Sequence, residues 1–215
     1  GPAFQEGADT VLGFRRALGN GGHHGFGQVT LVGGLLGDAR EALGTLWYHD
    51  HGVHHTAENA YHGLVGQYHM FDPLEQSLPI PHGDYDVPLI ISDALFNNDG
   101  SLLFTLEDDA GMWGDVILVN GRPWPVMQVE RRKYRFRMLG VGVSRAWRFS
   151  LDSGDPMAVI ATDGGLMPAP QSVTSLRHIM AERYEVVAGQ DERAAAARFG
   201  RLDILVNNAG IQHVA

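Results

Sequence analysis

The feature that most limits what this chain can fold into is a series of short apolar runs separated by turn residues. The runs occupy residues 87–93, 101–106, 115–119 and 125–129. Each is of strand length, and most are flanked by glycine, asparagine or aspartate, which end strands and form turns. Residues 98–100 and the pair Asn120-Gly121 accept the positive φ of tight hairpins. The middle of the chain therefore predicts antiparallel β-sheet in a sandwich or barrel.

Residues 133–138 alternate with a period of two, so their side chains should project from the two faces of a strand in turn. The apolar members are Tyr134, Phe136 and Met138, and the basic members are Lys133, Arg135 and Arg137. Charged side chains are rarely buried without partners. We therefore predict that the apolar row faces a core and that the basic row is solvated.

The two ends of the chain have a different pattern. Residues 28–32 predict a strand and residues 38–43 a helical run. Near the other end, the alanine-rich residues 191–199 predict a helix that ends at Gly200, and residues 202–206 predict a buried strand. Both ends are therefore expected to form short α/β segments.

Charge and hydropathy argue against several classes of protein. The chain has 25 acidic and 16 basic residues, a net charge of -9, which opposes attraction to nucleic acid or anionic lipid. No apolar run approaches the roughly 18 residues of a membrane-spanning helix, and the first residues lack the pattern of a signal peptide. We expect a soluble protein with neither nucleic acid nor membrane as a partner, and its compartment is left open.

The chain contains no cysteine. This removes disulfides, zinc-thiolate sites, iron–sulfur clusters and thiol nucleophiles. It also removes the thiolate ligand that a blue copper centre requires.

Histidines are concentrated in one segment: five of the eleven lie within residues 45–68. His49 and His51 flank a single aspartate, and alternate strand residues project from one face about 6.6 Å apart. Two imidazoles so placed can bind one metal ion or two neighbouring ions, and imidazole suits copper, zinc, nickel and iron. His54 and His55 follow closely and are candidate additional ligands. A bare His-x-His also arises by chance, so these residues could equally be surface or core histidines.

The sequence around these histidines resembles the multicopper oxidases, in particular the branch of spore-coat laccases and bilirubin oxidases. The matching motifs are Thr45-Leu-Trp-Tyr-His-Asp-His51, Tyr85-Asp-Val-Pro-Leu89, Ile117-Leu-Val-Asn-Gly-Arg-Pro-Trp124, Arg132-Lys-Tyr-Arg-Phe-Arg137 and Ala181-Glu-Arg-Tyr-Glu-Val-Val187. Motifs of this kind in this order, spread over residues 45–187, are highly specific.

The resemblance implies a mainly β fold: an incomplete, cupredoxin-like antiparallel β-sandwich with short α/β segments at both ends. It divides the chain into four parts. Residues 45–73 match the end of a first cupredoxin-like domain and residues 74–188 match part of a second. Residues 1–44 form an unassigned α/β segment, and residues 189–215 form a helix-strand piece of another kind.

The resemblance also implies copper as the cofactor and a small phenolic substrate. In the family, the histidines that match His49 and His51 ligate the type 3 copper pair, where oxygen is reduced to water. The full trinuclear cluster takes eight histidines from four motifs, and electrons enter through a type 1 copper with a cysteine ligand. Only one of those four motifs is present here. The implied function is laccase-like oxidation of phenols with oxygen as acceptor, impaired by the absent ligands.

Residues 190–215 include Asn207-Asn208-Ala209-Gly210 and resemble a fragment of the short-chain dehydrogenases. Catalysis in that family needs a Tyr-x-x-x-Lys motif. The only lysine is Lys133, and Val129 stands four residues before it. An NAD-linked dehydrogenase is therefore the weakest alternative.

The other alternative is a non-catalytic β-sandwich, a fragment or a chimera, in which the histidines are vestigial. In either reading the missing strands of the two sandwiches would leave backbone groups unpaired at sheet edges. We therefore predict a homo-oligomer that associates through exposed sheet edges.

Overall fold

The computed structural model describes residues 29–31, 44–71, 73–105, 111–189 and 204–208. Its strands are β1 (Val29–Leu31), β2 (Gly44–Asp50), β3 (Val65–Met70), β4 (Asp86–Ala94), β5 (Val116–Val119), β6 (Arg122–Pro123), β7 (Tyr134–Gly140), β8 (Trp147–Leu151), β9 (Met157–Thr162), β10 (Gly165–Val173), β11 (Leu176–His178), β12 (Arg183–Ala188) and β13 (Ile204–Asn208). Its helices are α1 (Thr56–Tyr61), α2 (Pro73–Gln76) and a 3-10 turn at Gly83–Tyr85. The prediction of a mainly β fold is confirmed.

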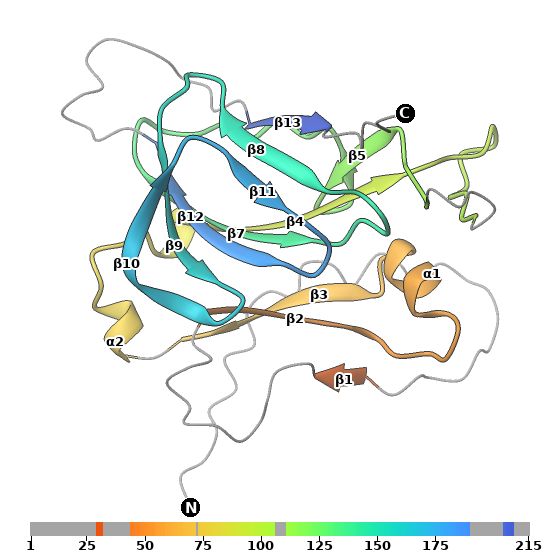
Figure 1. Ribbon diagram of the computed structural model, residues 1–215, viewed down its shortest axis with the longest axis horizontal. Coiled ribbons are helices and arrows are strands. Elements are labelled where there is room, and N and C mark those ends of the chain that lie inside the picture. Colours follow the sequence, from red (N-terminus) through yellow and green to blue (C-terminus); the bar gives the residue numbers. More distant parts are fainter. Residues whose placement is uncertain (1–28, 32–43, 72, 106–110, 190–203, 209–215) are drawn as a thin grey trace, which may run out of the picture.

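The strands form three stacked sheets (Figure 1). The central sheet has seven strands in the order β10-β9-β12-β7-β4-β5-β6, with the sheet β11-β8-β13 on one side and the sheet β1-β2-β3 on the other. Neighbouring strands are antiparallel except for β4 and β7, which run parallel from the pair Asp86 and Arg135 to the pair Ile91 and Gly140. The predicted antiparallel sandwich therefore contains one parallel pair, which requires a long connection between its strands.

The apolar core lies between the central sheet and the sheet β11-β8-β13. Phe136 and Met138 project from β7, and they meet Trp147 and Phe149 from β8. Trp147 has none of its surface exposed. Burial of one such side chain contributes about 1.5–3 kcal/mol, so this layer supplies much of the fold's stability.

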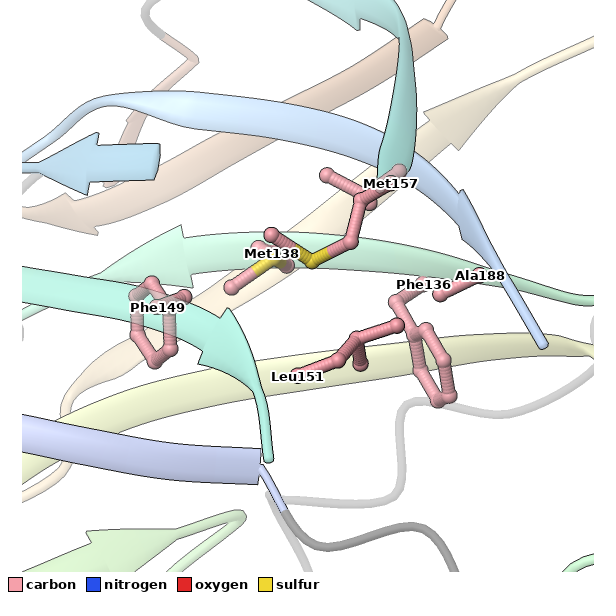
Figure 2. A pocket seen from close by; sticks show the side chains of 7 residues that line it. Phe136, Met138, Phe149, Leu151, Met157 and Ala188 are labelled. Carbon is pink, nitrogen blue, oxygen red and sulfur yellow. The ribbon is translucent and has the colours of Figure 1, made fainter. Parts of the chain in front are cut away.

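Figure 2 shows a small cavity in this core. It has a volume of about 20 Å³, close to the space of a single water probe. All seven lining residues are apolar, among them Met138 and Met157 (Figure 2). A cavity without polar groups has nothing to orient a substrate, so we interpret it as imperfect packing and not as a functional site.

The basic row of residues 133–138 differs from the prediction at Arg135 and Arg137, whereas Lys133 is exposed as predicted. The alternation is confirmed, because Phe136 and Met138 enter the core while Arg135 and Arg137 occupy the opposite face of β7. That face is not solvated: both arginines are 0% exposed. The sheet β1-β2-β3 and the helix α2, which follows β3 in the chain, cover this face. The local pattern of residues 133–138 could not reveal this cover.

Acidic partners make this burial possible. Glu185 of β12 accepts hydrogen bonds from both guanidinium groups, at 2.9 Å from Arg135 Nε and 2.8 Å from Arg137 Nη1. Asp86 of β4 accepts two from Arg137, each 2.7 Å long. Glu75 of α2 pairs with Arg135. We call Glu75, Asp86, Arg135, Arg137 and Glu185 the ionic layer; it joins the central sheet to the elements that cover it.

Two of the four predicted strand runs are confirmed, as β4 and β5. Residues 125–129 form no strand, and Trp124, between β6 and this run, has a positive φ of 38°. Within residues 101–105, the described part of the predicted run 101–106, pairing is limited to a bridge between Phe96 and Leu102. Both predicted hairpin turns are present, with positive φ at Gly100, Asn120 and Gly121.

At the ends of the chain, the predicted strands at residues 28–32 and 202–206 correspond to β1 and β13. The predicted helices at residues 38–43 and 191–199, with the cap at Gly200, lie outside the described residues. The four-part division of the chain stays a prediction. In the described residues, no helix combines the length and the apolar character needed to cross a membrane.

Candidate metal site

The candidate site lies at the end of β2 and on the residue that follows it, where three aromatic rings follow one another at every second position. The ring of Trp47 stacks on the ring of His49 with centroids 4.5 Å apart. The centroids of His49 and His51 are also 4.5 Å apart. The period of two of an extended chain places all three rings on the same face. The predicted ligand pair is therefore brought together, with His51 exposed and His49 partly buried.

A hydrogen bond fixes which nitrogen of His49 can bind a metal ion. Nδ1 of His49 lies 2.8 Å from the backbone carbonyl oxygen of Asp50. Because a carbonyl oxygen only accepts, Nδ1 must carry the proton that is donated. Neutral His49 then keeps its lone pair on Nε2, the nitrogen left for coordination, which is the usual arrangement of metal-binding histidines.

The side chain of Asp50 is held by partners other than the two rings. Its Oδ2 accepts hydrogen bonds from the side-chain amide of Asn59 and, at 2.9 Å, from the backbone N–H of Gly52. These hydrogen bonds, the one from Asn59 first, hold the pKa of Asp50 below its usual value. The carboxylate is thus kept anionic in the turn after β2.

His54 and His55 are both exposed in the turn before α1. His54 has a positive φ of 67°. Nδ1 of His55 lies 3.3 Å from a carboxylate oxygen of Glu58 in the first turn of the helix. The structure does not gather either residue into a group with the His49 and His51 pair, so their role as further ligands stays a prediction.

Copper accepts imidazole ligands, so the two rings fit copper in kind. In the part of the chain that the structure describes, no group of three or more histidine, cysteine, aspartate or glutamate side chains is placed to hold a metal ion. His49 and His51 therefore fit copper as two ligands of a larger set and do not form a closed site alone.

Two contributors to this site were not predicted from the sequence: Trp47, which stacks on His49, and Asn59, which binds Asp50. The period of two that grouped the histidines also includes Trp47, so that residue could have been found. Asn59 lies on α1 and nine positions from Asp50, and no local pattern links the two.

Comparison with protein families gives a match over most of the chain. The model described as Multicopper oxidase matches residues 47–196. The match includes His49, His51 and the whole central sheet. It also includes the strands β8 and β11, which complete the core.

Curated relatives of two kinds match the chain: proteins named as a bilirubin oxidase or a laccase, and a protein named for cell division. Bilirubin oxidase of Albifimbria verrucaria is 46% identical over 156 residues, which cover 69% of this chain and 27% of that protein. A laccase of Bacillus subtilis (strain 168) is 40% identical over 177 residues, 77% of this chain and 34% of that protein. Cell division protein FtsP of Escherichia coli (strain K12) is 37% identical over 150 residues, with 69% and 32% coverage. The chain spans about a third of the length of these relatives.

Among solved structures, the multicopper oxidase McoA from Aquifex aeolicus matches with a TM-score of 0.65 and 35% identity, covering 69% of this chain and 34% of that one. The predicted cupredoxin-like fold is confirmed by this likeness. The short-chain dehydrogenase resemblance at residues 190–215 finds no support among these relatives.

Proposed function

This chain belongs to the multicopper oxidase family, and from that premise we propose that it takes part in laccase-like oxidation of small phenolic substrates with oxygen as the acceptor. Copper is the cofactor that membership of the family implies. The observation that carries the proposal is the adjacent pair of rings of His49 and His51, 4.5 Å apart at the end of β2. Relatives named as a laccase and a bilirubin oxidase support the general kind of reaction.

The contribution of this chain is a pair of oriented ligands. The bond to the Asp50 carbonyl leaves Nε2 of His49 as the coordinating atom, and stacking on Trp47 limits rotation of the ring. His51 adds a second imidazole from the same face. When bound, copper supplies one-electron acceptance from each of four phenols and delivery of four electrons to oxygen, which with four protons gives two waters.

The remaining ligands are not among these residues. The chain has no cysteine for a type 1 centre, and the described residues contain no group of three metal-binding side chains. Oxidation at this site therefore requires ligands from another segment or another chain. The activity of the 215 residues alone is expected to be impaired.

Copper titration of the purified chain tests this proposal. Replacement of both ligands, His49→Ala with His51→Ala, should weaken Cu(II) binding more than about a hundredfold, since even outer partners of metal ligands are worth 10–100-fold. Calorimetry gives the affinity. The part of the tryptophan quenching that a Trp47→Phe variant loses reports the metal's place, because Trp47 is one of four tryptophans and its ring stacks on His49. Oxygen consumption with a phenolic dye measures any oxidation.

The matched control is His62→Ala, because His62 is an exposed histidine outside the pair. It should bind copper as the native chain does. A further variant, His54→Ala with His55→Ala, measures whether those residues assist. Copper binding that is equal in the native chain and in the double variant of His49 and His51 would refute the proposed site.

A second candidate function is that of a non-catalytic β-sandwich. It is favoured by the relative named as a cell division protein, which is 37% identical over 150 residues, and by the open ligand set. In that case His49 and His51 are vestigial. Absence of copper binding by the native chain would favour this function over oxidation.

We also propose that the chain associates with copies of itself through the outer edge of β3. In the described residues β3 pairs only with β2, so its other edge carries unpaired backbone groups. The edge strand β10 is less suited, because Pro168 and Pro170 lack a backbone N–H.

Light scattering after gel filtration tests this association. Tyr68→Lys on β3 should shift the chain toward the monomer, since an edge charge opposes strand pairing. Ser77→Lys, exposed and outside the strands, should leave the assembly unchanged. Identical masses for the native chain and Tyr68→Lys would exclude this edge as the interface.

A further inference from the structure

We propose that Asp50 is a positioning residue that sets the relative placement of both imidazoles, and this inference rests on the proposed copper site at His49 and His51. Asp50 lies between the two histidines in sequence and makes hydrogen bonds to the ring of His49 and to the turn that carries His51. Its backbone carbonyl accepts a hydrogen bond from the ring of His49. Its carboxylate accepts one from the backbone of Gly52, in the turn that carries His51. Neither group needs to contact the metal ion.

The carbonyl of Asp50 orients His49. Its oxygen accepts the proton of Nδ1 at 2.8 Å, which fixes both the tautomer and the direction of Nε2. The hydrogen bond joins the ring to the carbonyl of the next residue in the chain. The angle of the ring therefore depends on the backbone conformation at Asp50.

The carboxylate of Asp50 holds the turn that carries His51. Oδ2 accepts the backbone N–H of Gly52 at 2.9 Å, which closes an Asx turn around His51. A Cβ atom at position 52 would lie only 2.7 Å from this oxygen, so a side chain there would displace the carboxylate from its present position. With its two flanking residues joined, the backbone of His51 has little freedom to move its ring away from His49.

Asn59 connects this turn to α1. Its side-chain amide donates to the same Oδ2 of Asp50. The carbonyl of Gly52 in turn accepts from the backbone N–H of His55 at 2.9 Å and from the hydroxyl of Thr56 at 3.1 Å. The end of β2, the turn and the start of α1 thus form one hydrogen-bonded unit, with the carboxylate of Asp50 at its centre.

A purely structural role for Asp50 predicts a different result from a positioning role. If the residue only stabilises the turn, its removal lowers the free energy of unfolding and leaves the copper site unchanged in the folded protein. If it positions the rings, the folded variant binds copper more weakly and with altered ligand geometry. Copper affinity and the Cu(II) electron paramagnetic resonance spectrum separate the two.

The test uses Asp50→Ala, which keeps the carbonyl and removes the carboxylate. We expect Cu(II) affinity to fall about tenfold, the range for loss of an outer partner of a metal ligand, with changed hyperfine splitting. Restoration is tested by the exchanged pair, Asp50→Asn with Asn59→Asp. Asn at position 50 can accept from Gly52 and donate to the new carboxylate, so affinity and spectrum should return toward those of the native chain.

The matched control is Asp99→Ala. Asp99 forms an Asx turn of the same kind, with its Oδ1 accepting the N–H of Ser101 at 3.0 Å, in a separate turn of the chain. Its removal should leave copper binding unchanged. Should Asp50→Ala fail to fold, the exchanged pair compared with Asn59→Asp alone decides the matter, because Asn59→Asp places two carboxylates together and should weaken binding.

The outcomes are distinguishable. A native chain that binds no copper overturns the proposed function and this inference with it. A native chain that binds copper while Asp50→Ala binds it equally well, with the same spectrum, overturns only the positioning role. An exchanged pair that stays as weak as Asn59→Asp also overturns it.

Discussion

Replacement of Arg135 by methionine is expected to lower the free energy of unfolding by about 3–5 kcal/mol, the range for removal of one partner from a buried ion pair. Arg135 is 0% exposed and hydrogen-bonded to Glu185, and it pairs with Glu75. Methionine fills similar space without charge. The three carboxylates of the ionic layer, Glu75, Asp86 and Glu185, would then face the single guanidinium of Arg137. Removal of the charge therefore leaves buried anions poorly compensated.

Urea unfolding measures this loss. Arg177→Met on β11 is the matched control, since Arg177 is exposed at the surface and surface changes are usually within about 0.5 kcal/mol. If Arg135→Met cost no more than Arg177→Met, the ionic layer would not contribute to stability.

Acid should destabilise the protein through His69, whose pKa is lowered from 6.5 to about 4. Burial is the main cause, followed by the positive charge of Arg137, and Asp86 opposes the shift. The unfolded chain takes up the proton first as the pH falls, so stability is complete above about pH 6.5 and declines toward pH 4. Between pH 7 and pH 5 we expect a loss of about 2 kcal/mol from this residue.

Comparison of urea unfolding at the two pH values checks this prediction, with His69→Gln as the variant. The variant should lose most of the pH dependence. A smaller dependence of the same sign should remain, because burial also lowers the pKa of His178. His62→Gln, at an exposed position, should retain the full loss. A native chain equally stable at both pH values would contradict the assignment to His69.

The strand β7 illustrates how far the sequence alone could go. The period of two correctly separated Phe136 and Met138 from Arg135 and Arg137. The predicted solvent exposure of Arg135 and Arg137 was wrong, since exposure depends on which elements cover that face. Glu75 and Glu185, which neutralise the arginines, are 60 and 50 positions from Arg135. Pairing between such distant residues leaves no trace in a local pattern.

The candidate site was predictable to a similar degree. The period of two of an extended chain predicted that His49 and His51 share one face, and their rings do lie together. The tautomer of His49 and the bond from Asn59 to Asp50 depend on the backbone path through the turn and the return of α1. Both require the folded structure.

The parallel pairing of β4 with β7 bears on how the molecule assembles. Antiparallel neighbours such as β9 and β10 can pair directly as a hairpin. By contrast, β4 can pair with β7 only after the intervening chain has folded back to place β7 beside it. The contact of Thr45 with Glu185, 140 positions apart, closes a longer loop still. Closure of such long loops slows folding. In the partly folded chain, the arginines of β7 and the unpaired strand edges are exposed and can associate with neighbouring chains.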